Sequence, residues 1–546
     1  MALDTLEVFG TEYTNVAGFK ATDDNNQTKT YIRPQGTKSI SANGTGIDVT
    51  AYASVDVNVS GGGGTSTKQV NFIDYDGTIL HSYSKAEINA MTQESDLPAN
   101  PSHTGLTAQG WNWTLAQIKA QLTAIPDGPV WVGQMYVTTS GDTEIDCVFS
   151  DAARLSPILT IAVNGTVSVD WGDNTTPDTV TGDSLTNRQG PQHTYASPGS
   201  YTIKISVVSG SFSFYGSSNY SLLRKSTSAN QNRVYSNCVQ AIRIGTGITS
   251  FGNTYAFHNC YSLTSITIPN TITSIGTYAF NHCYSLTSIT IPSGVTSINT
   301  SDFYYCYSLN NISIPSTVTS TGDYVFYGCY SLTSITIPSN ITSIGSYIFS
   351  NCCSLVSITI PSNVTSIAAY AFEYCRSIVS ITIPSGVTSI AEGAFHYCSS
   401  LNSIIIPNTI TSIGAYAFEY CGSLASITIP SNVTSIGSTA FYNCYSLNKI
   451  TIPNGVTSIG TYLFYGCYSL ASITIPNGVT SIENYAFSNC YGVAEYHVLP
   501  TTPPTLGTSI FTGIPSDCVI YVPSASLADY QSASGWSDYA SYMQGE

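Results

Sequence analysis

The stretch that decides the fold reads Leu263-Thr-Ser-Ile-Thr-Ile-Pro-Asn-Thr-Ile-Thr-Ser-Ile-Gly-Thr-Tyr-Ala-Phe-Asn-His-Cys283-Tyr-Ser, and it recurs every 23 residues. Ten prolines keep this step, from Pro269 to Pro476. Two further columns keep it as well: Phe257, Phe280, Phe303, Phe326, Phe349, Phe372, Phe395, Phe418, Phe441, Phe464 and Phe487, and the cysteines from Cys260 to Cys490. A fixed period of about 20–50 residues indicates a solenoid or another repeat architecture.

Each unit carries the pattern of one short strand and one return path. Ile266, Thr267 and Ile268 alternate with period two, which predicts a strand with one buried face. Pro269 cannot donate to a strand ladder and ends the strand. We expect Gly276 to permit the next bend. The residues expected to point inward are Leu263, Ile266, Ile268, Ile272, Ile275, Ala279, Phe280 and Cys283. One unit cannot bury this face alone, so the units must stack.

The fold class follows as mainly β, in a chain of several domains. We expect a β attachment module at 1–60, a Gly-rich linker at 61–66, a small mixed α+β module at 67–150, a β-sandwich at 151–208, a linker at 209–236, the solenoid at 237–495 and a cap at 496–546. Within the second module, Trp111, Trp113 and Trp131 are the expected core, and Thr114 is the expected N-cap of a helix that ends at Leu122. Near the start of the array, Ile242 precedes Ile266 by 24 residues, which indicates one inserted residue near Asn253.

The bulk composition excludes several classes of function. Only 9% of the 546 residues are charged, and the net charge is −16. Binding to a phosphate backbone requires clustered Lys and Arg, so we expect no nucleic-acid partner. No window holds about 18 successive apolar residues, so we expect no membrane insertion. The first residues lack a basic region followed by an apolar core, so we expect no secretory signal peptide.

The repeat resembles the Treponema-type leucine-rich repeats of the BspA-like family, whose pattern is L-x-x-I-x-I-P-x-x-V-T-S-I-G-x-x-A-F-x-x-C. Residues 260–490 match this pattern almost position by position. The resemblance implies a parallel-strand solenoid and, for the family, adhesion to host proteins or to other cells.

Two weaker resemblances concern the residues before the repeat. Val169-Asp-Trp-Gly-Asp173 and His193-Thr-Tyr-Ala-Ser-Pro-Gly-Ser-Tyr-Thr-Ile-Lys-Ile205 are similar to motifs of PKD-like immunoglobulin sandwiches, which implies a spacer or adhesion unit at 151–208. The stretches 42–59 and 97–113 look like modules of phage and prophage tail proteins. That second resemblance implies a virion protein whose N-terminal modules bind other tail proteins.

One stretch is similar to the nucleophile motif of haloacid-dehalogenase phosphatases, namely Phe72-Ile-Asp-Tyr-Asp-Gly-Thr-Ile-Leu80. The resemblance would make Asp74 the nucleophile and Asp76 the general acid, with Gly172-Asp173 and Asp178 as the remaining acidic pair. The surrounding sequence shows no alternating strand–helix units. We therefore favour a hairpin with Asp76-Gly77 as its turn.

The cysteine column is interpreted as a row of small buried hydrophobes. Neighbouring column cysteines would lie about 4.8 Å apart, but their side chains run parallel, which disfavours disulfides. The absence of a C-x-x-C pair argues against zinc. Cys353 stands where many units have Tyr, and we expect it to be exposed. The histidines have no metal-site spacing, and His258, His282 and His396 are expected to be surface or packing residues.

Two columns remain as binding candidates. The outward residues of the predicted strands form a polar ladder, which Ile405 and Lys449 interrupt. Its candidate ligand-binding residues are Ser265, Thr267, Ser288, Thr290, Ser313, Ser334, Thr336, Ser357, Thr359, Ser380, Thr382, Ser426, Thr428, Thr451 and Thr474. The aromatic column that follows each Cys comprises Tyr261, Tyr284, Tyr307, Tyr330, Tyr445 and Tyr468. Tyr rings beside hydroxyls suit carbohydrate or protein contacts. Alternatively, the polar ladder only supports strand structure and solubility.

The sequence therefore predicts a recognition protein rather than an enzyme, with no cofactor, no catalytic residue and no metal site. Our leading hypothesis is a phage tail-associated receptor-binding protein that reads a protein or glycan of the host surface with its solenoid, located in the virion tail. The alternative is a bacterial cell-surface BspA-like adhesin, located at the cell surface or extracellularly. A phosphatase using Asp74 is the third hypothesis. A homo-oligomer is compatible with each.

Overall fold

The computed structural model describes the backbone of strands 5–8, 18–22, 28–32 and 53–55, and residues 68–124, 129–218, 222–225, 235, 237–252 and 254–546. The chain divides into two compact units, Met1–Ser66 and Thr67–Glu546. In the first unit, β1 (Thr5–Val8), β2 (Gly18–Thr22), β3 (Thr28–Ile32) and β4 (Ala53–Val55) form an antiparallel sheet in that order. The linker expected at 61–66 and the residue expected to be inserted near Asn253 lie outside the described residues.

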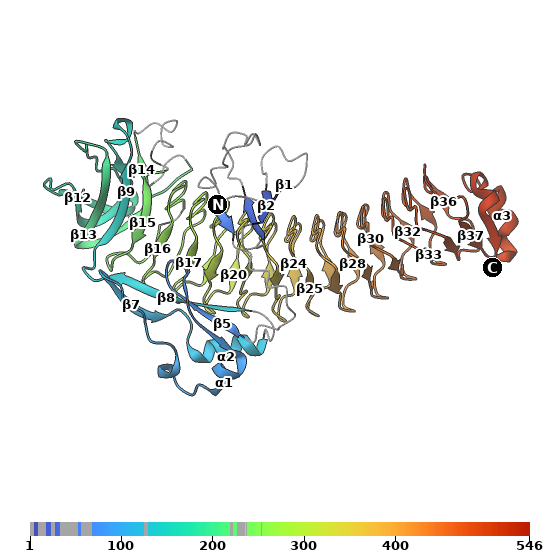
Figure 1. Cartoon of the computed structure of the whole chain (residues 1–546), viewed down its shortest axis with the longest axis horizontal. Coiled ribbons are helices and arrows are strands. Elements are labelled where there is room, and N and C mark those ends of the chain that lie inside the picture. The colour runs from blue at the N-terminus through green and yellow to red at the C-terminus, as the bar shows by residue number, and fades with distance from the viewer. Residues whose placement is uncertain are drawn as a thin grey trace. The chain divides into compact units, whose positions relative to one another are not determined.

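The repeat folds into a row of stacked coils (Figure 1). A first set of parallel strands follows the predicted Ile-Thr-Ile positions. These strands are β16 (Ser265–Thr267), β17 (Ser288–Thr290), β19 (Asn311–Ser313), β21 (Ser334–Ile335), β23 (Ser357–Ile358), β25 (Ser380–Thr382), β27 (Ser403–Ile405), β29 (Ser426–Ile427), β31 (Lys449–Ile450) and β33 (Ser472–Ile475). Residues 23 positions apart lie side by side, as in the pairs Ile289↔Ile312 and Ile427↔Ile450. The predicted parallel solenoid is confirmed.

A second parallel ladder follows the Ser-Ile pair of each unit and was not expected from the sequence. Its strands are β18 (Ser297–Ile298), β20 (Ser320–Thr321), β22 (Ser343–Ile344), β24 (Ser366–Ile367), β26 (Ser389–Ile390), β28 (Ser412–Ile413), β30 (Ser435–Ile436), β32 (Ser458–Ile459), β34 (Ser481–Ile482) and β36 (Thr505–Leu506). Each of these strands is two residues long, which is too short for an alternating pattern to be recognised.

The tight bends of the coils depend on residues other than the expected glycine. The backbone is left-handed at a tyrosine in most units, for example at Tyr278 (φ 60°) and Tyr370 (φ 56°), and again before the cysteine, as at Tyr374 (φ 55°). This conformation costs roughly 1–2 kcal/mol for a residue with a Cβ. The main-chain N–H of each bend residue offsets this cost by donating to the next coil, as Tyr370 donates to Glu392 at 2.9 Å.

The interior of the coils is a stack of phenylalanines and cysteines. Phe372 is fully buried, and its ring lies parallel to those of Phe349 and Phe395 at centroid distances of 5.5 and 5.6 Å. Each thiol of the 23-residue column from Cys283 to Cys490 also donates to the carbonyl of a phenylalanine in the preceding coil, as Cys375 does to Phe349 at 3.1 Å. All fifteen cysteines are unbridged, and Cys353 is half-buried rather than exposed. The column thiols are therefore hydrogen-bond donors as well as small apolar side chains.

An antiparallel sheet closes the N-terminal end of the array. It contains β12 (Asp178–Gln189), β11 (Ile161–Asp170), β13 (Gly199–Phe214) and β9 (Thr143–Phe149), and it continues through β15 (Val239–Arg243) into β16. Ile242 pairs with Ile266, as the 24-residue spacing predicted. Strand β13 runs past the expected boundary at 208, and β9 joins this sheet although it precedes residue 151.

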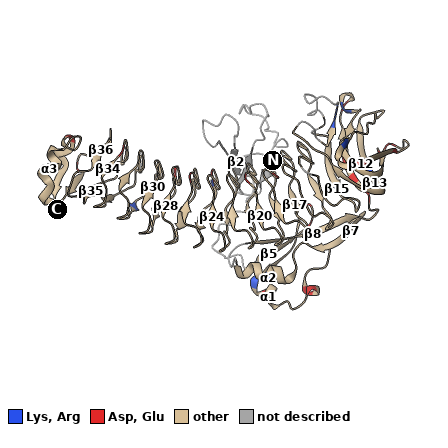
Figure 2. Cartoon of the chain, turned by 180° about the vertical axis from the view of Figure 1, so that it is seen from behind, with Lys and Arg blue, Asp and Glu red and all other residues tan. Residues whose placement is uncertain are grey.

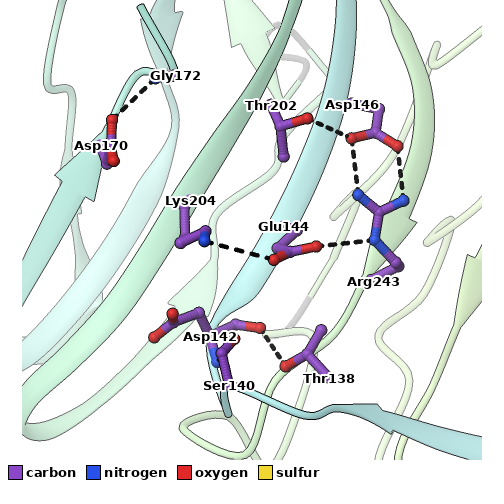
Figure 3. A network of polar contacts seen from close by, with 10 residues as sticks. All are labelled: Thr138, Ser140, Asp142, Glu144, Asp146, Asp170, Gly172, Thr202, Lys204 and Arg243. Carbon is purple, nitrogen blue, oxygen red and sulfur yellow. Dashed lines mark hydrogen bonds and ion pairs between the residues drawn. The ribbon is translucent and has the colours of Figure 1, made fainter. Parts of the chain in front are cut away.

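The junction between this sheet and the first coil is held by charges (Figure 3). Arg243 on β15 donates to Glu144 at 2.9 Å and to both carboxylate oxygens of Asp146 at 2.6 and 2.8 Å, both on β9. Thr202 on β13 also donates to Asp146. Burial alone would raise the pKa of Asp146, but the hydrogen bonds from Arg243 and Thr202 lower it below its ordinary value.

The two motif stretches that resemble PKD-like domains meet in this region. His193 lies 2.7 Å from Asp173 and stacks on Trp171, and Tyr195 donates to the main-chain carbonyl of Trp171. The expected two-sheet sandwich is not what the described residues form. Among the described residues, the large sheet is accompanied by the two-stranded pair of β10 (Ile158–Leu159) and β14 (Leu223–Arg224), and its buried face shares one core with the first coils.

The C-terminal end is closed by strands and short helices. Strands β35 (Glu495–Val498), β37 (Val519–Val522) and β38 (Met543–Gly545) extend the first ladder. The helix α3 (Leu527–Ser532) and a short helix at Ser537–Tyr542 lie between β37 and β38 in the sequence. Trp536 is fully buried and donates to the carbonyl of Pro504 at 2.7 Å. The buried apolar side chains of these elements join the core of the last coils.

Residues 68–138 form a small α+β module. Its sheet has the order β6 (Ile79–Ser84), β5 (Lys68–Ile73), β8 (Val130–Thr138) and β7 (Leu106–Trp111), with α1 (Lys85–Ala90) and α2 (Leu115–Ala124). Thr114 caps α2 as predicted, since its hydroxyl accepts from the main-chain N–H of Gln117. Trp113 and Trp131 are buried and Trp111 is half-buried.

We expect Phe372→Ala to destabilise the array by about 3–5 kcal/mol, because it removes a fully buried ring between two stacked neighbours. Thermal unfolding followed by circular dichroism measures the effect. Val379→Ala is the matched control, since Val379 is 42% exposed on the next coil. Equal unfolding midpoints for the two variants would contradict the assigned inside and outside of the coil.

The thiol column also predicts a loss of stability in alkali. Burial raises the pKa of the column thiols above their ordinary value of 9.0, to about 12 at Cys260 and Cys490. A group whose pKa is raised by folding stabilises the folded state below its unfolded pKa, and this contribution is lost as pH rises further. We expect the thermal unfolding midpoint to be constant from about pH 7 to 8.5 and to fall between about pH 9 and 10. Over the latter range the free energy of unfolding should decrease by at most ~1.4 kcal/mol per pH unit for each thiol. A midpoint independent of pH over that range would disprove this.

Candidate recognition surface

The module of residues 68–138 lies on the strand face of the first coils and covers part of the predicted polar ladder. Strand β8 contacts β16, β17 and β19. Ser313 donates to the carbonyl of Trp131 at 2.7 Å, and Thr336 donates to the carbonyl of Pro129 and accepts from the N–H of Trp131. Ser288 donates to the carbonyl of Tyr75. These three ladder hydroxyls therefore bind main-chain groups of another part of the same chain.

Side-chain amides of the module bind the solenoid in return. Asn112 donates to the carbonyl of Ile291 at 2.9 Å, and Gln121 donates to the carbonyl of Ile337 at 2.8 Å. The amide oxygen of Gln121 also accepts from the N–H of Ser339 at 2.8 Å. Both amides are buried, with 1% of each residue exposed.

The close approach of β8 requires a glycine. A Cβ at Gly133 would lie 2.1 Å from the hydroxyl of Thr290, so only glycine leaves room for this coil. The module is thus shaped to the face that it covers.

The ladder consequently has two parts, which we call the covered ladder and the free ladder. In the covered ladder, Thr267, Ser288, Thr290, Ser313 and Thr336 are buried, and Ser265 and Ser334 are half-buried. The free ladder spans β23 to β33, where Thr359 is half-buried and the other outward residues are exposed. These are Ser357, Ser380, Thr382, Ser403, Ile405, Ser426, Thr428, Lys449, Thr451, Ser472 and Thr474. Sequence reasoning could not separate the two parts, because their repeat positions are alike.

The tyrosine column is exposed only at its C-terminal end. Tyr445 and Tyr468 are 39% and 44% exposed, whereas Tyr261, Tyr284, Tyr307 and Tyr330 are half-buried. Successive rings stack, as Tyr261 and Tyr284 do at 4.5 Å with an interplanar angle of 9°. The faces of stacked rings contact each other, so most tyrosines of the column have no free ring face for a sugar.

The residues of the phosphatase-like motif form a docked hairpin. Asp74 is 4% exposed and accepts hydrogen bonds from the N–H of Tyr75 and from Tyr136, and it lies 2.7 Å from His103. Gly77 occupies the turn with φ 89°, as the hairpin interpretation predicted. Asp173, expected as part of a completing acidic pair, is bound to His193 elsewhere in the chain. The structure therefore does not bring together the acidic residues that the phosphatase hypothesis requires.

Lys, Arg, Asp and Glu are sparse along the coils (Figure 2). Residues 239–490 contain six acidic and three basic side chains. His396 lies between two of the acidic ones, 3.2 Å from Glu373 and 3.5 Å from Glu419, and burial raises the pKa of Glu419. No cluster suited to a metal ion occurs in the described ranges. None of the helices there has the length and apolar character of a membrane span.

The family of the BspA type leucine rich repeat region matches residues 207–320, 249–379 and 365–494, more than half of the chain. This chain belongs to that family. Nothing in the comparisons supports a PKD-like or phage-tail identity for the residues before the repeat, nor a location in a virion. No curated protein matches the chain.

Several solved structures of bacterial leucine-rich repeat proteins are similar to the chain. One from Bacteroides ovatus is 24% identical, with 57% of this chain and 96% of that chain covered and a TM-score of 0.44. A leucine rich cell surface protein from Faecalibacterium prausnitzii is 29% identical, with 56% and 93% covered and a TM-score of 0.38. A protein from Treponema pallidum is 24% identical, with 42% and 78% covered and a TM-score of 0.18.

We expect Thr336→Lys to loosen the module from the solenoid by about 3 kcal/mol, because it removes two hydrogen bonds and forces a charge into a buried site. Hydrogen exchange of the β8 amides measures the loosening. Thr382→Lys is the matched control, because Thr382 occupies the same repeat position in the exposed free ladder. Unchanged exchange in Thr336→Lys would show that β8 does not rest on this face.

Proposed function

We propose that this protein is a bacterial cell-surface recognition protein of the BspA-like kind, and that it contacts its ligand through the free ladder. The observation that carries the proposal is the division of the strand face: the chain itself occupies the first coils, and six further coils present the same hydroxyl groups to solvent. Family membership supports adhesion as the class of function.

The composition of the free ladder supports binding through hydrogen bonds and apolar contacts rather than through ion pairs. Only Lys449 among its outward residues is charged, and Ile405, at 64% exposed, places a large apolar side chain in the middle of the face. Val356 and Val379, each 42% exposed, lie beside the first strands of the free ladder. Burying these exposed side chains against a partner would be favourable, which supports this face as the contact surface.

The proposal is tested by charging the face without disturbing the core. We expect the full chain carrying Thr382→Lys, Ile405→Lys and Thr428→Lys to lose at least about tenfold of its affinity for the target surface, equal to ~1.4 kcal/mol. The measurement is binding of labelled protein to epithelial cells and, in parallel, to bacterial cells.

The matched control places the same charges on the other ladder. Ser366→Lys, Ser389→Lys and Ser435→Lys substitute exposed first residues of β24, β26 and β30. We expect this control to bind as the unaltered chain does. If both triple variants bound equally well, the free ladder would not be the contact surface.

A further inference from the structure

The repeat prolines leave a row of main-chain carbonyls without their usual partners. At the last coil, the N–H of Leu499 donates to the carbonyl of Ile475, 24 residues before it, at 3.1 Å. In the preceding coils the residue in the place of Leu499 is a proline, which has no N–H. The carbonyls deprived in this way include those of Ile360, Ile383, Ile406, Ile429 and Ile452.

The chain satisfies two such carbonyls with primary amides. Ile291 accepts from Asn112, and Ile337 accepts from Gln121. Gln121 binds both sides of the proline, because its oxygen also accepts from the N–H of Ser339. Gln109 binds the N–H of Asn270 at 2.8 Å, the same repeat position as Ser339 three coils earlier. Three amide side chains of the module thus use one repeated Ile-Pro-Ser/Asn turn.

The free ladder carries the same turn on five coils. The residues after the prolines are Ser362, Ser385, Asn408, Ser431 and Asn454, and all are exposed. Within the described part of the chain, neither their N–H groups nor the five isoleucine carbonyls have a hydrogen-bond partner. Each turn therefore presents one acceptor and one donor in the arrangement that Gln121 occupies.

We propose that the free ladder binds the surface of a partner protein. Asn and Gln side chains of that partner would each bind one Ile-Pro-Ser/Asn turn of the solenoid. This inference rests on the proposed function and names the chemistry of its partner. A primary amide carries an N–H and a C=O on the same side, so it can bond both groups of one turn at once. The N-acetyl group of an amino sugar is a trans secondary amide, with these groups on opposite sides. The turn therefore favours a protein over a glycan.

The test is a titration of the full chain, ¹⁵N-labelled and deuterated, followed by its amide resonances. Acetamide serves as the primary-amide probe, and N-methylacetamide and N-acetylglucosamine serve as secondary-amide probes. We expect acetamide to shift the amides of Ser362, Ser385, Asn408, Ser431 and Asn454 several-fold more than either secondary amide does. The amide of Ser339, already bound to Gln121, should not respond.

A gain-of-site variant checks the assignment independently. In Gln121→Ala the turn at Ile337-Pro-Ser339 loses its occupant, and we expect Ser339 to respond to acetamide as the free turns do. Uniform shifts along the chain, or no shifts at the five turns, would overturn the proposal. Equal shifts from N-acetylglucosamine would replace the protein partner by a glycan. The cell-binding test of the lysine variants is separate, so its failure would be distinguishable from failure here.

Discussion

Every coil of this protein depends on the main-chain hydrogen bonds that it exchanges with the next coil. A 23-residue unit has too few residues to bury its own apolar side chains, and its bends place tyrosines in a left-handed conformation. Both costs are offset only when another coil lies alongside and accepts from bend residues such as Tyr370. The array therefore needs a partner at each end, which the chain supplies as the sheet joined through Arg243 and as the strands and helices around Trp536.

The strand face also has main-chain groups that need hydrogen-bond partners, and these partners must come from outside the array. The prolines that end each strand remove a donor from the ladder, and the carbonyls left behind need hydration or a ligand. Over the first coils the module with Asn112 and Gln121 fills this need, and Gly133 allows it to approach closely. The covered ladder is thus an internal complex between two parts of the same chain.

The repeat allowed most of the solenoid to be predicted from sequence, because identical residues in identical places have one environment. The burial of Phe372 and the parallel register both followed from the period. The occupied half of the ladder was not predictable, since Asn112 and Gln121 bind main-chain groups about 200 positions away that leave no trace in the sequence. The two-residue strands of the second ladder gave too short a pattern. The left-handed bend lies at Tyr278 rather than at Gly276, and the ring of Tyr278 stacks on that of Tyr255.

The hydrogen bonds from the module to the solenoid end at Ser339. The coils between Ser339 and the C-terminal cap are held by the coils on either side of them. Insertion or deletion of whole 23-residue units after Thr336 would keep the register of both ladders and preserve both closures. Such a change would alter only the valency of the exposed face, by one turn per unit. Under the proposed function, gene duplication or recombination within the repeat would change the number of contact sites without redesigning the core.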